Sequence, residues 1–196
     1  MRNFRRSALL AAMLCEGSGP IDMDPRLSPF LLAATVFVLD RLTKWVIKSH
    51  FSAWDTLTII PGFFNIVHSE NPGIAFGMLA SAPSFWRDLV LIAFSVFVMA
   101  FISKLLLQPE RTAGHTWLLK VGLALILGGA FGNLYDRIVN KTVTDFIEVH
   151  ADVNGSSYFF PAFNVADSAI TVGAGLLILD MWRARERKGR TAEVHR

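Results

Sequence analysis

Apolar residues are concentrated in four stretches of the chain, each of about the length of a helix that crosses a bilayer. These stretches cover residues 29–49, 85–107, 117–134 and 162–182. A transmembrane helix needs roughly 20 predominantly apolar residues. Ser28 and Pro29 also suit the start of the first helix, as an N-cap and a first-turn proline. The pattern therefore predicts an all-α membrane protein with four transmembrane helices.

Residues 51–83 are too polar and too often interrupted to span a bilayer. Short apolar runs at 56–60, 63–67 and 74–79 are separated by Pro61-Gly62 and by Asn71-Pro72-Gly73, which predicts strands joined by turns. A later segment, 142–147, alternates between apolar and polar residues, as an extended strand does. We therefore expect a small extracytoplasmic β-sheet and an interfacial loop at the membrane surface.

Composition and charge agree with a membrane location. Of the 196 residues, 53% are hydrophobic and 18% are charged, whereas soluble domains carry roughly 25% charged residues. Lys and Arg gather before residue 29, around the connector between the second and third spans, and after residue 182. Because basic residues favour the cytoplasmic side, both termini are predicted to be cytoplasmic. Residues 1–28 are interpreted as a disordered extension, 29–182 as the membrane domain and 183–196 as a disordered basic tail.

Cysteine and histidine usage argues against disulfide or metal chemistry. Cys15 is the one cysteine, and therefore no internal disulfide can form. The five histidines are scattered, with no H-E-x-x-H pattern and no cysteine pair, which are the usual signatures of a zinc site. We predict neither a metal nor a cofactor.

Several polar residues fall inside the predicted spans. Asp40 and Lys44 are four residues apart, share a helix face and can form an ion pair. This pair is either self-neutralised, with Lys44 reaching the interface, or it orients polar groups of a site. Asn133, Asp136 and Arg137 also share a face, which on spacing alone favours an interfacial cap with an Asp–Arg pair. Earlier in the same span, glycines lie four apart at Gly128 and Gly132, which is typical of close helix packing.

Two carboxylates fall at the outer edge of the predicted membrane. Asp145 lies in the alternating segment, and Asp167 lies in a polar stripe with Asn164 at the start of the fourth span. Carboxylates near hydrocarbon are costly and are therefore functional candidates. A close pair of aspartates suits acid–base chemistry, as in an aspartic peptidase. A proton-coupled transporter is the alternative that the residues alone leave open, although no internal repeat is evident.

Four blocks of sequence, in order on this frame, resemble one family. They are DRLTK, ENPGIAFGML, GGAFGNLYDR with VTDF, and FNVADSAI. From about Pro29 to Trp182 the chain is similar to lipoprotein signal peptidase, the bacterial signal peptidase II. The resemblance implies that Asp145 and Asp167 are the catalytic pair. It implies supporting roles for eight further residues: Asp40, Lys44, Asn71, Gly128, Asn133, Arg137, Asn164 and Ala166. Without it, Asn71 before Pro72 would be interpreted as a turn residue.

The resemblance also implies a reaction and its partners. The expected activity is that of an intramembrane aspartic endopeptidase, which removes the signal peptide of a prolipoprotein by cleaving before a diacylglyceryl-modified cysteine. The expected partners are such prolipoproteins and membrane lipid, with no nucleic acid, and the expected state is a monomer. The implied location is the bacterial inner membrane, with the site at the outer face. The alternatives are a proton-coupled transporter and a non-catalytic lipoprotein-binding protein.

Overall fold

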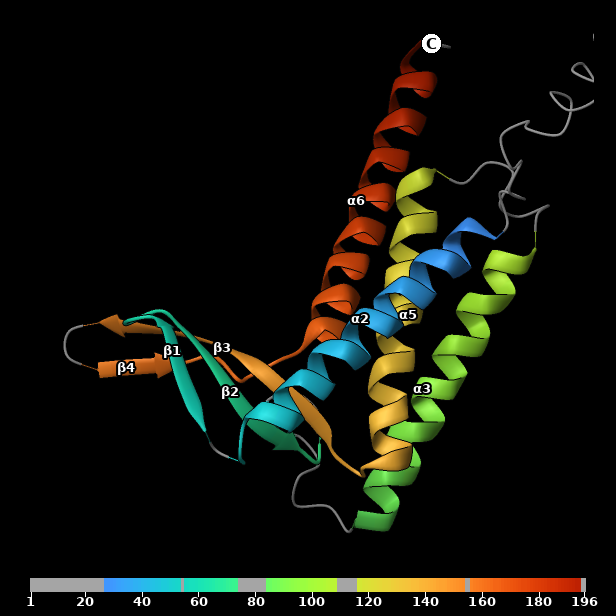
Figure 1. Cartoon of the computed structure of the whole chain (residues 1–196). Helices are drawn as coiled ribbons and strands as arrows, with labels where there is room; N and C mark the ends of the chain where they lie inside the picture. The colour runs from blue at the N-terminus through green and yellow to red at the C-terminus, as the bar shows by residue number, and fades with distance from the viewer. Residues whose placement is uncertain (1–26, 54, 74–83, 109–115, 154–155, 195–196) are drawn as a thin grey trace, which may run out of the picture.

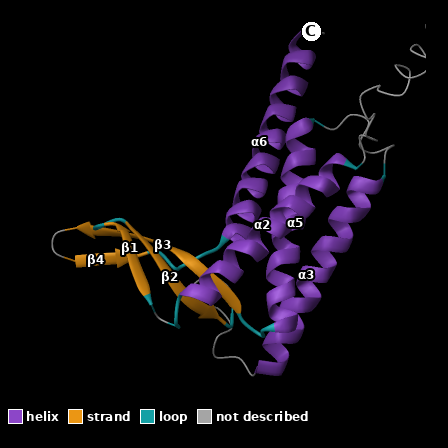
Figure 2. Ribbon diagram, in the orientation of Figure 1, coloured by secondary structure: helices purple, strands orange, loops and turns teal. Residues whose placement is uncertain are grey.

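The computed structural model describes residues 27–53, 55–73, 84–108, 116–153 and 156–194, which form four long helices and a four-stranded sheet. The helices are α2 (Ser28–His50), α3 (Ser84–Leu107), α5 (Trp117–Val139) and α6 (Val165–Val194). The strands are β1 (Thr56–Ile60), β2 (Phe64–Asn71), β3 (Val143–Val153) and β4 (Ser156–Phe159). The helices form one bundle, and the sheet lies beside the end of α2 and the start of α6 (Figure 1; Figure 2).

The helices lie where the hydrophobic pattern places them. α2 and α3 agree with the predicted stretches within one residue at each end, and α5 begins at Trp117 as expected but continues past Leu134 to Val139. α6 begins at Val165 rather than at residue 162. The reason is that Phe163 forms an antiparallel bridge with Ile147 of β3, which keeps the chain extended up to the helix start.

The end of α6 differs from the prediction. The sequence predicts a helix that ends at Trp182 and an irregular tail, but α6 continues to Val194. Residues 183–188 are mostly Arg, Ala, Glu and Lys, which have high helix propensity. A helix that is already formed also grows at little cost, because each added residue gains one hydrogen bond. The structure therefore extends α6 beyond the predicted end at Trp182.

Among the described residues, three helical segments are long and apolar enough to cross a bilayer. They are Phe85–Leu107, Trp117–Val139 and Val165–Glu186. α2 has 23 residues and thus a similar length, but Asp40, Arg41 and Lys44 lie within it and make it less apolar. The described structure is therefore a mostly helical protein with three candidate membrane helices and a small antiparallel sheet.

The sheet has the order β1-β2-β3-β4, with every neighbouring pair antiparallel. β1 matches its prediction, β2 and β3 are longer than predicted, and β4 was not predicted. The strand expected at 74–79 and the extension at 1–26 lie outside the described residues. Because β2 precedes α3 and β3 follows α5, their pairing joins distant parts of the sequence. It aligns Ser69 with Asp145 and Asn71 with Val143.

α5 is the central helix and packs against α2, α3 and α6. Its glycines allow this close approach. A Cβ atom built on Gly128 would lie 2.5 Å from the Ala33 carbonyl oxygen of α2, and one on Gly132 would contact both Asp40 of α2 and Ala166 of α6. The predicted close packing at Gly128 and Gly132 is therefore confirmed, and the two glycines bring α2 and α6 together around α5.

Candidate active site

Four elements meet around one cavity at the sheet end of the bundle. The cavity has a volume of about 590 Å³ and is lined by Asp145 of β3 and Asp167 of α6. The ends of β2 and α5 contribute Asn71, Asn133 and Arg137 to its lining. Asn71 and Asp167, which are 96 positions apart in the sequence, thus line the same cavity, together with apolar residues such as Phe163 and Ile170.

The first turn of α6 is held by reciprocal hydrogen bonds. The Asp167 backbone N–H donates to Asn164 Oδ1 at 3.0 Å, and the Asn164 backbone N–H donates to Asp167 Oδ2 at 3.3 Å. This is the arrangement of a capping box, which satisfies backbone donors that have no partner within the helix. The Ala166 N–H donates to Asp40 Oδ1 of α2 at 3.0 Å. The fold therefore fixes Asp167 at the start of α6.

Asp145 is held by two side-chain amides. Asn164 Nδ2 donates to Asp145 Oδ1 at 2.7 Å, and Asn71 Nδ2 donates to Asp145 Oδ2 at 3.0 Å. Asp145 is only 3% exposed. Burial, followed by repulsion from the Asp167 carboxylate, raises the pKa of Asp145 to about 7, although both amide hydrogen bonds act in the opposite direction. Near neutral pH this carboxyl group can therefore hold or release a proton.

Asn133 connects Asp167 to the interior of the bundle. Its Nδ2 donates to Asp167 Oδ1 at 2.7 Å. Its Oδ1 accepts from Lys44 Nζ at 3.0 Å and from Asn164 Nδ2 at 3.3 Å. Asn133 and Asn164 thus join the two aspartates into one hydrogen-bond network, and neither aspartate pairs with a cation among the described residues. Such a network orients the carboxylates without neutralising them.

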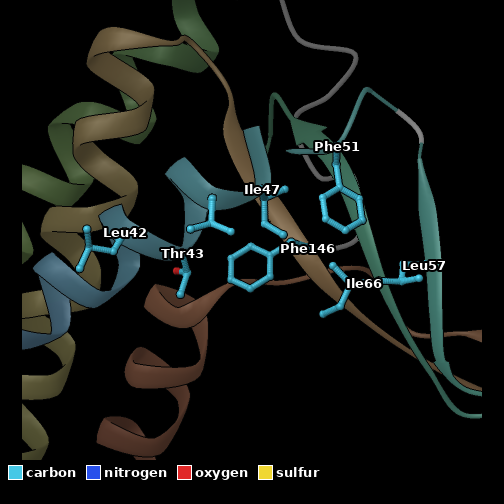
Figure 3. Close-up of a pocket in the computed structure, with 8 residues that line it drawn as sticks. Leu42, Thr43, Ile47, Phe51, Leu57, Ile66 and Phe146 are labelled. Carbon is cyan, nitrogen blue, oxygen red and sulfur yellow. The ribbon is translucent and has the colours of Figure 1, made fainter. Parts of the chain in front are cut away.

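The residue after Asp145 faces a different cavity. Phe146 lines a smaller cavity of about 380 Å³ between the end of α2 and the sheet, lined almost entirely by apolar side chains. Its ring lies between Ile47 of α2 and Ile66 of β2 (Figure 3). Because neighbouring side chains of a strand point to opposite faces, the buried Phe146 fixes the direction of Asp145. Burying a phenylalanine contributes about 1.5–3 kcal/mol, which favours this register.

A second charged cluster lies behind the cavity, between α2 and α5. Lys44 Nζ lies 2.8 Å from Asp40 Oδ2 and 2.8 Å from Asp136 Oδ2, and all three side chains are fully buried. Arg41 also pairs with Asp136, and its guanidinium stacks over the Tyr135 ring at 4.3 Å. We call Asp40, Arg41, Lys44 and Asp136 the ion network. It contains two carboxylates and two cations.

The ion network confirms one predicted pair and corrects two other expectations. Asp40 and Lys44 form the expected i,i+4 pair. Lys44 does not reach the interface, however, because Asp136 and Asn133 provide polar partners inside the bundle. Asp136 pairs with Arg41 and Lys44 rather than with Arg137. The Arg137 guanidinium instead donates to the carbonyl oxygens of Asn133 and Gly73, each at 3.3 Å.

The remaining predicted residues have different surroundings. Asn71 accepts from the Gly73 N–H at 2.9 Å, as a turn residue does, and also donates to Asp145. Gly128 and Ala166 do not line the cavity but lie at the α2–α5 and α5–α6 contacts. Arg41 and Asp136 were not predicted as site residues, since their pairing joins positions 95 residues apart. Among the described residues, no group of three His, Cys, Asp or Glu side chains could hold a metal ion.

Comparison with known proteins identifies the family. Residues 32–183 match the family model described as signal peptidase (SPase) II. The chain belongs to the signal peptidase II family. It is 42% identical to the lipoprotein signal peptidase of Solibacter usitatus over 165 residues, which cover 84% of this chain and 96% of that protein. It is 41% identical to the lipoprotein signal peptidase of Pseudomonas aeruginosa UCBPP-PA14, over 85% of this chain and 94% of that protein.

A solved structure agrees with this assignment. It is described as a bacterial membrane enzyme at 2.3 Å resolution, and it is similar to this chain with a TM-score of 0.70 and 28% identity, over 82% of this chain and 91% of the other. Family membership identifies the protein as a peptidase. Together with the apolar helices, it also identifies an integral membrane protein. The transporter and the non-catalytic binding protein are therefore not favoured.

Proposed function

We propose that the protein is an aspartic endopeptidase that removes signal peptides from diacylglyceryl-modified prolipoproteins, with Asp145 and Asp167 as its catalytic pair. The observation that supports this most directly is the network of amides around the two carboxylates, which orients them toward one cavity that Arg137 also lines. The name of the relatives, lipoprotein signal peptidase, supports the substrate class. Cleavage is expected before the lipid-modified cysteine.

In the proposed mechanism, Asp145 carries the proton and Asp167 carries the charge. Burial favours the neutral form of Asp145 and raises its pKa to about 7. Asp167 lies at the N-terminus of α6, where backbone N–H groups and the helix dipole stabilise an anion. Amides from Asn71, Asn133 and Asn164 keep both carboxyl groups in place.

The hydrolysis then needs only these two carboxyl groups and water. Asp167 takes a proton from a water molecule, whose oxygen attacks the scissile carbonyl carbon while Asp145 gives its proton to the carbonyl oxygen. The tetrahedral intermediate returns a proton to Asp145 as its C–O double bond re-forms. The C–N bond breaks, and the proton on Asp167 passes to the leaving amine. Each such proton transfer contributes about 10²–10⁴-fold in rate.

We further propose that α2 is a fourth transmembrane helix. Its charged residues Asp40 and Lys44 are buried against α5 and α6, whereas its outer side is apolar and well exposed. The exposed apolar residues are Leu31, Val38, Leu39, Leu42 and Trp45. At 1.5 Å per residue, its 23 residues reach about 35 Å, enough to cross the roughly 30 Å core of a bilayer. The charges thus face protein and the apolar side faces lipid.

The arrangement of the helices and the sheet also indicates how the protein is oriented in the membrane. The start of α2 and the end of α6 lie toward one end of the bundle, and the sheet lies toward the other (Figure 1). Basic residues favour the cytoplasmic side and are abundant beyond Trp182. We therefore propose that both termini are cytoplasmic and that the cavity opens at the outer face, where water and a membrane-borne signal peptide can both reach it. A monomer contains every residue this mechanism uses.

Cleavage of a defined substrate tests the proposal. Purified protein in detergent is incubated with a diacylglyceryl-modified prolipoprotein, and release of the signal peptide is followed on a gel. Asp145→Asn and Asp167→Asn are each expected to lower the rate by at least about 10²–10⁴-fold. Both variants should retain the α-helical circular dichroism of the wild type.

Two controls make the result specific. Glu186→Gln removes an exposed carboxylate from the far end of α6 and should leave the rate unchanged. The precursor without its diacylglyceryl group should not be cleaved. Substantial cleavage by either folded aspartate variant would refute the catalytic pair, and binding without cleavage by the wild type would favour a non-catalytic binding protein.

A further inference from the structure

Glu70 of β2 lies beside the proposed site and has more polar partners than any other carboxylate of the described sheet. Thr142 Oγ1 donates to Glu70 Oε2 at 2.6 Å, and Thr144 Oγ1 donates to Glu70 Oε1 at 3.3 Å. His68 Nε2 lies 3.0 Å and Lys48 Nζ 3.3 Å from Glu70 Oε1. We call Lys48, His68, Glu70, Thr142 and Thr144 the Glu70 cluster. It links β2 to the start of β3 and to the last turn of α2.

The Glu70 cluster lies on the opposite face of the sheet from Asp145. In the β2–β3 pairing, Ser69 is opposite Asp145, Glu70 is opposite Thr144, and Asn71 is opposite Val143. Side chains alternate between the two faces along each strand, and opposite residues share a face. Asn71, Val143 and Asp145 accordingly line the cavity, whereas Glu70 and Thr144 contact each other behind it.

The groups around Glu70 favour the ionised form of its carboxyl group. Burial would raise the pKa of Glu70, but hydrogen bonds from Thr142 and His68, together with the Lys48 ammonium, hold it below its ordinary value. An ionised carboxylate forms stronger hydrogen bonds than a neutral group. Glu70 is therefore ionised at neutral pH, in contrast to Asp145, which can change its protonation there.

We propose that Glu70 is a positioning residue for the proteolytic reaction, because it fastens the end of β2 to β3 and α2 and thereby holds the Asn71 amide against Asp145. The inference rests on the proposed role of Asp145. Asn71 follows Glu70 directly and is the last residue of β2. Besides the pairing of Asn71 with Val143, the Glu70 cluster is therefore the side-chain attachment between β2 and β3 that lies next to the contact of Asn71 with Asp145.

A matched control lies on the same pair of strands. Glu148 of β3 accepts a hydrogen bond from Asn65 Nδ2 of β2 at 2.8 Å, and is thus also a carboxylate that joins β2 to β3. Its partner Asn65 lies six residues from Asn71, at the other end of β2. If cross-strand carboxylates only stabilise the sheet, Glu70 and Glu148 variants should behave alike.

The test compares Glu70→Ala, Asn71→Ala, their double variant and Glu148→Gln in the prolipoprotein cleavage assay. Misplacement of a reacting group by about 1 Å can cost about 10²-fold in rate. We therefore expect Glu70→Ala to lower kcat about 10- to 100-fold, with KM changed less than about 3-fold. Because Glu70 acts through Asn71, the double variant should be no slower than Asn71→Ala. Glu148→Gln should keep kcat within about 2-fold of wild type, since it holds no group of the site.

The pH dependence of kcat tests whether Glu70 acts on Asp145. A loss of sheet stability alone would not shift this pH dependence. The Asn71 amide favours the charged form of Asp145, and the other charged groups around Asp145 are Asp167 of α6, Lys44 of α2 and Arg137 of α5. None of these is altered by the substitution. Loss of the amide should raise the pKa of Asp145 and move the alkaline limb of the kcat profile to higher pH in both Glu70→Ala and Asn71→Ala.

The outcomes separate this inference from the proposed function. If the wild type cleaves and Asp145→Asn does not, the proposed function holds whatever Glu70 does. Additive losses in the double variant, an unshifted pH profile, or an unchanged kcat in Glu70→Ala would then overturn the role of Glu70. Should Glu70→Ala fail to fold, Glu70→Gln takes its place, because it keeps the volume and one acceptor oxygen. It is then expected to lower kcat about 3- to 10-fold, and unchanged kcat would overturn the inference.

Discussion

Two pairs of aspartates lie on either side of Asn133, and they differ in what surrounds them. Asp40 and Asp136 belong to the ion network, in which Lys44 and Arg41 supply an equal number of positive charges. Asp145 and Asp167 are held by the amides of Asn71, Asn133 and Asn164 instead. Asn133 contacts both groups, since it accepts from Lys44 and donates to Asp167.

The difference between amides and cations decides what each pair can do. A cation beside a buried carboxylate compensates its charge, and removing either partner leaves a costly buried charge. An amide supplies direction but no net charge, which leaves two nearby carboxylates to repel each other, and one of them then retains a proton. The ion network is accordingly suited to a structural role, and the amide-held pair is suited to proton transfer.

The largest expected effect comes from removing the shared cation of the ion network. Lys44→Met leaves Asp40 and Asp136 buried with only Arg41 as compensation. Breaking a buried ion pair on one side typically costs about 3–5 kcal/mol, and we expect a loss of this size in thermal unfolding followed by circular dichroism. Lys104→Met removes an exposed lysine from α3 and should change stability by less than about 0.5 kcal/mol.

A second substitution restores the balance of charge. In the double variant Lys44→Met/Asp40→Asn, Arg41 and Asp136 still form a pair, and an asparagine at position 40 can still accept from the Ala166 N–H. The double variant should therefore be more stable than Lys44→Met alone. A double variant that is as unstable as, or less stable than, the single one would show that lost packing, and not uncompensated charge, is what makes Lys44 essential.

A smaller effect is expected at Gly132 of α5, which lies between the ion network and the start of α6. A Cβ atom on Gly132 would contact the Asp40 carboxylate and lie 3.3 Å from Ala166 Cβ, so that it would push the ion network away from the start of α6. Overpacking of this kind costs about 1–3 kcal/mol, and we expect Gly132→Ala to lower the thermal midpoint and the cleavage rate together.

Gly175 of α6 is the matched position for this test, because a Cβ atom there would have no neighbour within 4 Å. Glycine in a helix interior is less stable than alanine by about 0.5–1 kcal/mol. Gly175→Ala should therefore leave stability unchanged or raise it slightly. A loss in Gly175→Ala equal to that in Gly132→Ala would contradict the close contact between α5, Asp40 and Ala166.

The sequence predicts the elements of this fold better than it predicts their partners. Uninterrupted apolar residues place α3 and the start of α5, since burial in lipid depends only on local composition. In α2 the apolar pattern places the helix but not its two sides, because Asp40 and Lys44 are on the protein side and exposed apolar residues such as Leu42 are on the other. Which face of a helix meets protein is a property of the assembled bundle.

In the site, too, the sequence does not predict which residues from different elements come into contact. Spacing of three and four places Asn133, Asp136 and Arg137 on one face, but the nearest opposite charge along the helix, Arg137, is not the partner of Asp136. The partners of Asp136 are Arg41 and Lys44 of α2, and no local sequence pattern predicts these pairs. Likewise, the sequence alone indicates a turn residue at Asn71. The pairing of β2 with β3 brings its amide into contact with Asp145. The roles of these residues in catalysis remain predictions.

The smallest expected effect is a change of folding stability with pH, which the buried carboxyl group of Asp145 causes. The pKa of Asp145 rises from 3.8 to about 7, because burial and then Asp167 disfavour its charge. Between these two pH values the folded state binds more protons than the unfolded state, and the wild type therefore loses stability as the pH rises.

Asp145→Asn removes this loss, because an asparagine cannot ionise. The thermal midpoint of Asp145→Asn, relative to that of the wild type, should therefore be higher at pH 8 than at pH 5. A difference of about 1 kcal/mol corresponds to roughly 2–4 °C in a chain of this size. Asp55→Asn, which changes an exposed aspartate, should show no such pH dependence. If the relative midpoint of Asp145→Asn were the same at both pH values, or higher at pH 5, Asp145 would be charged throughout this range. Asp145 could not then be the member of the pair that holds the proton.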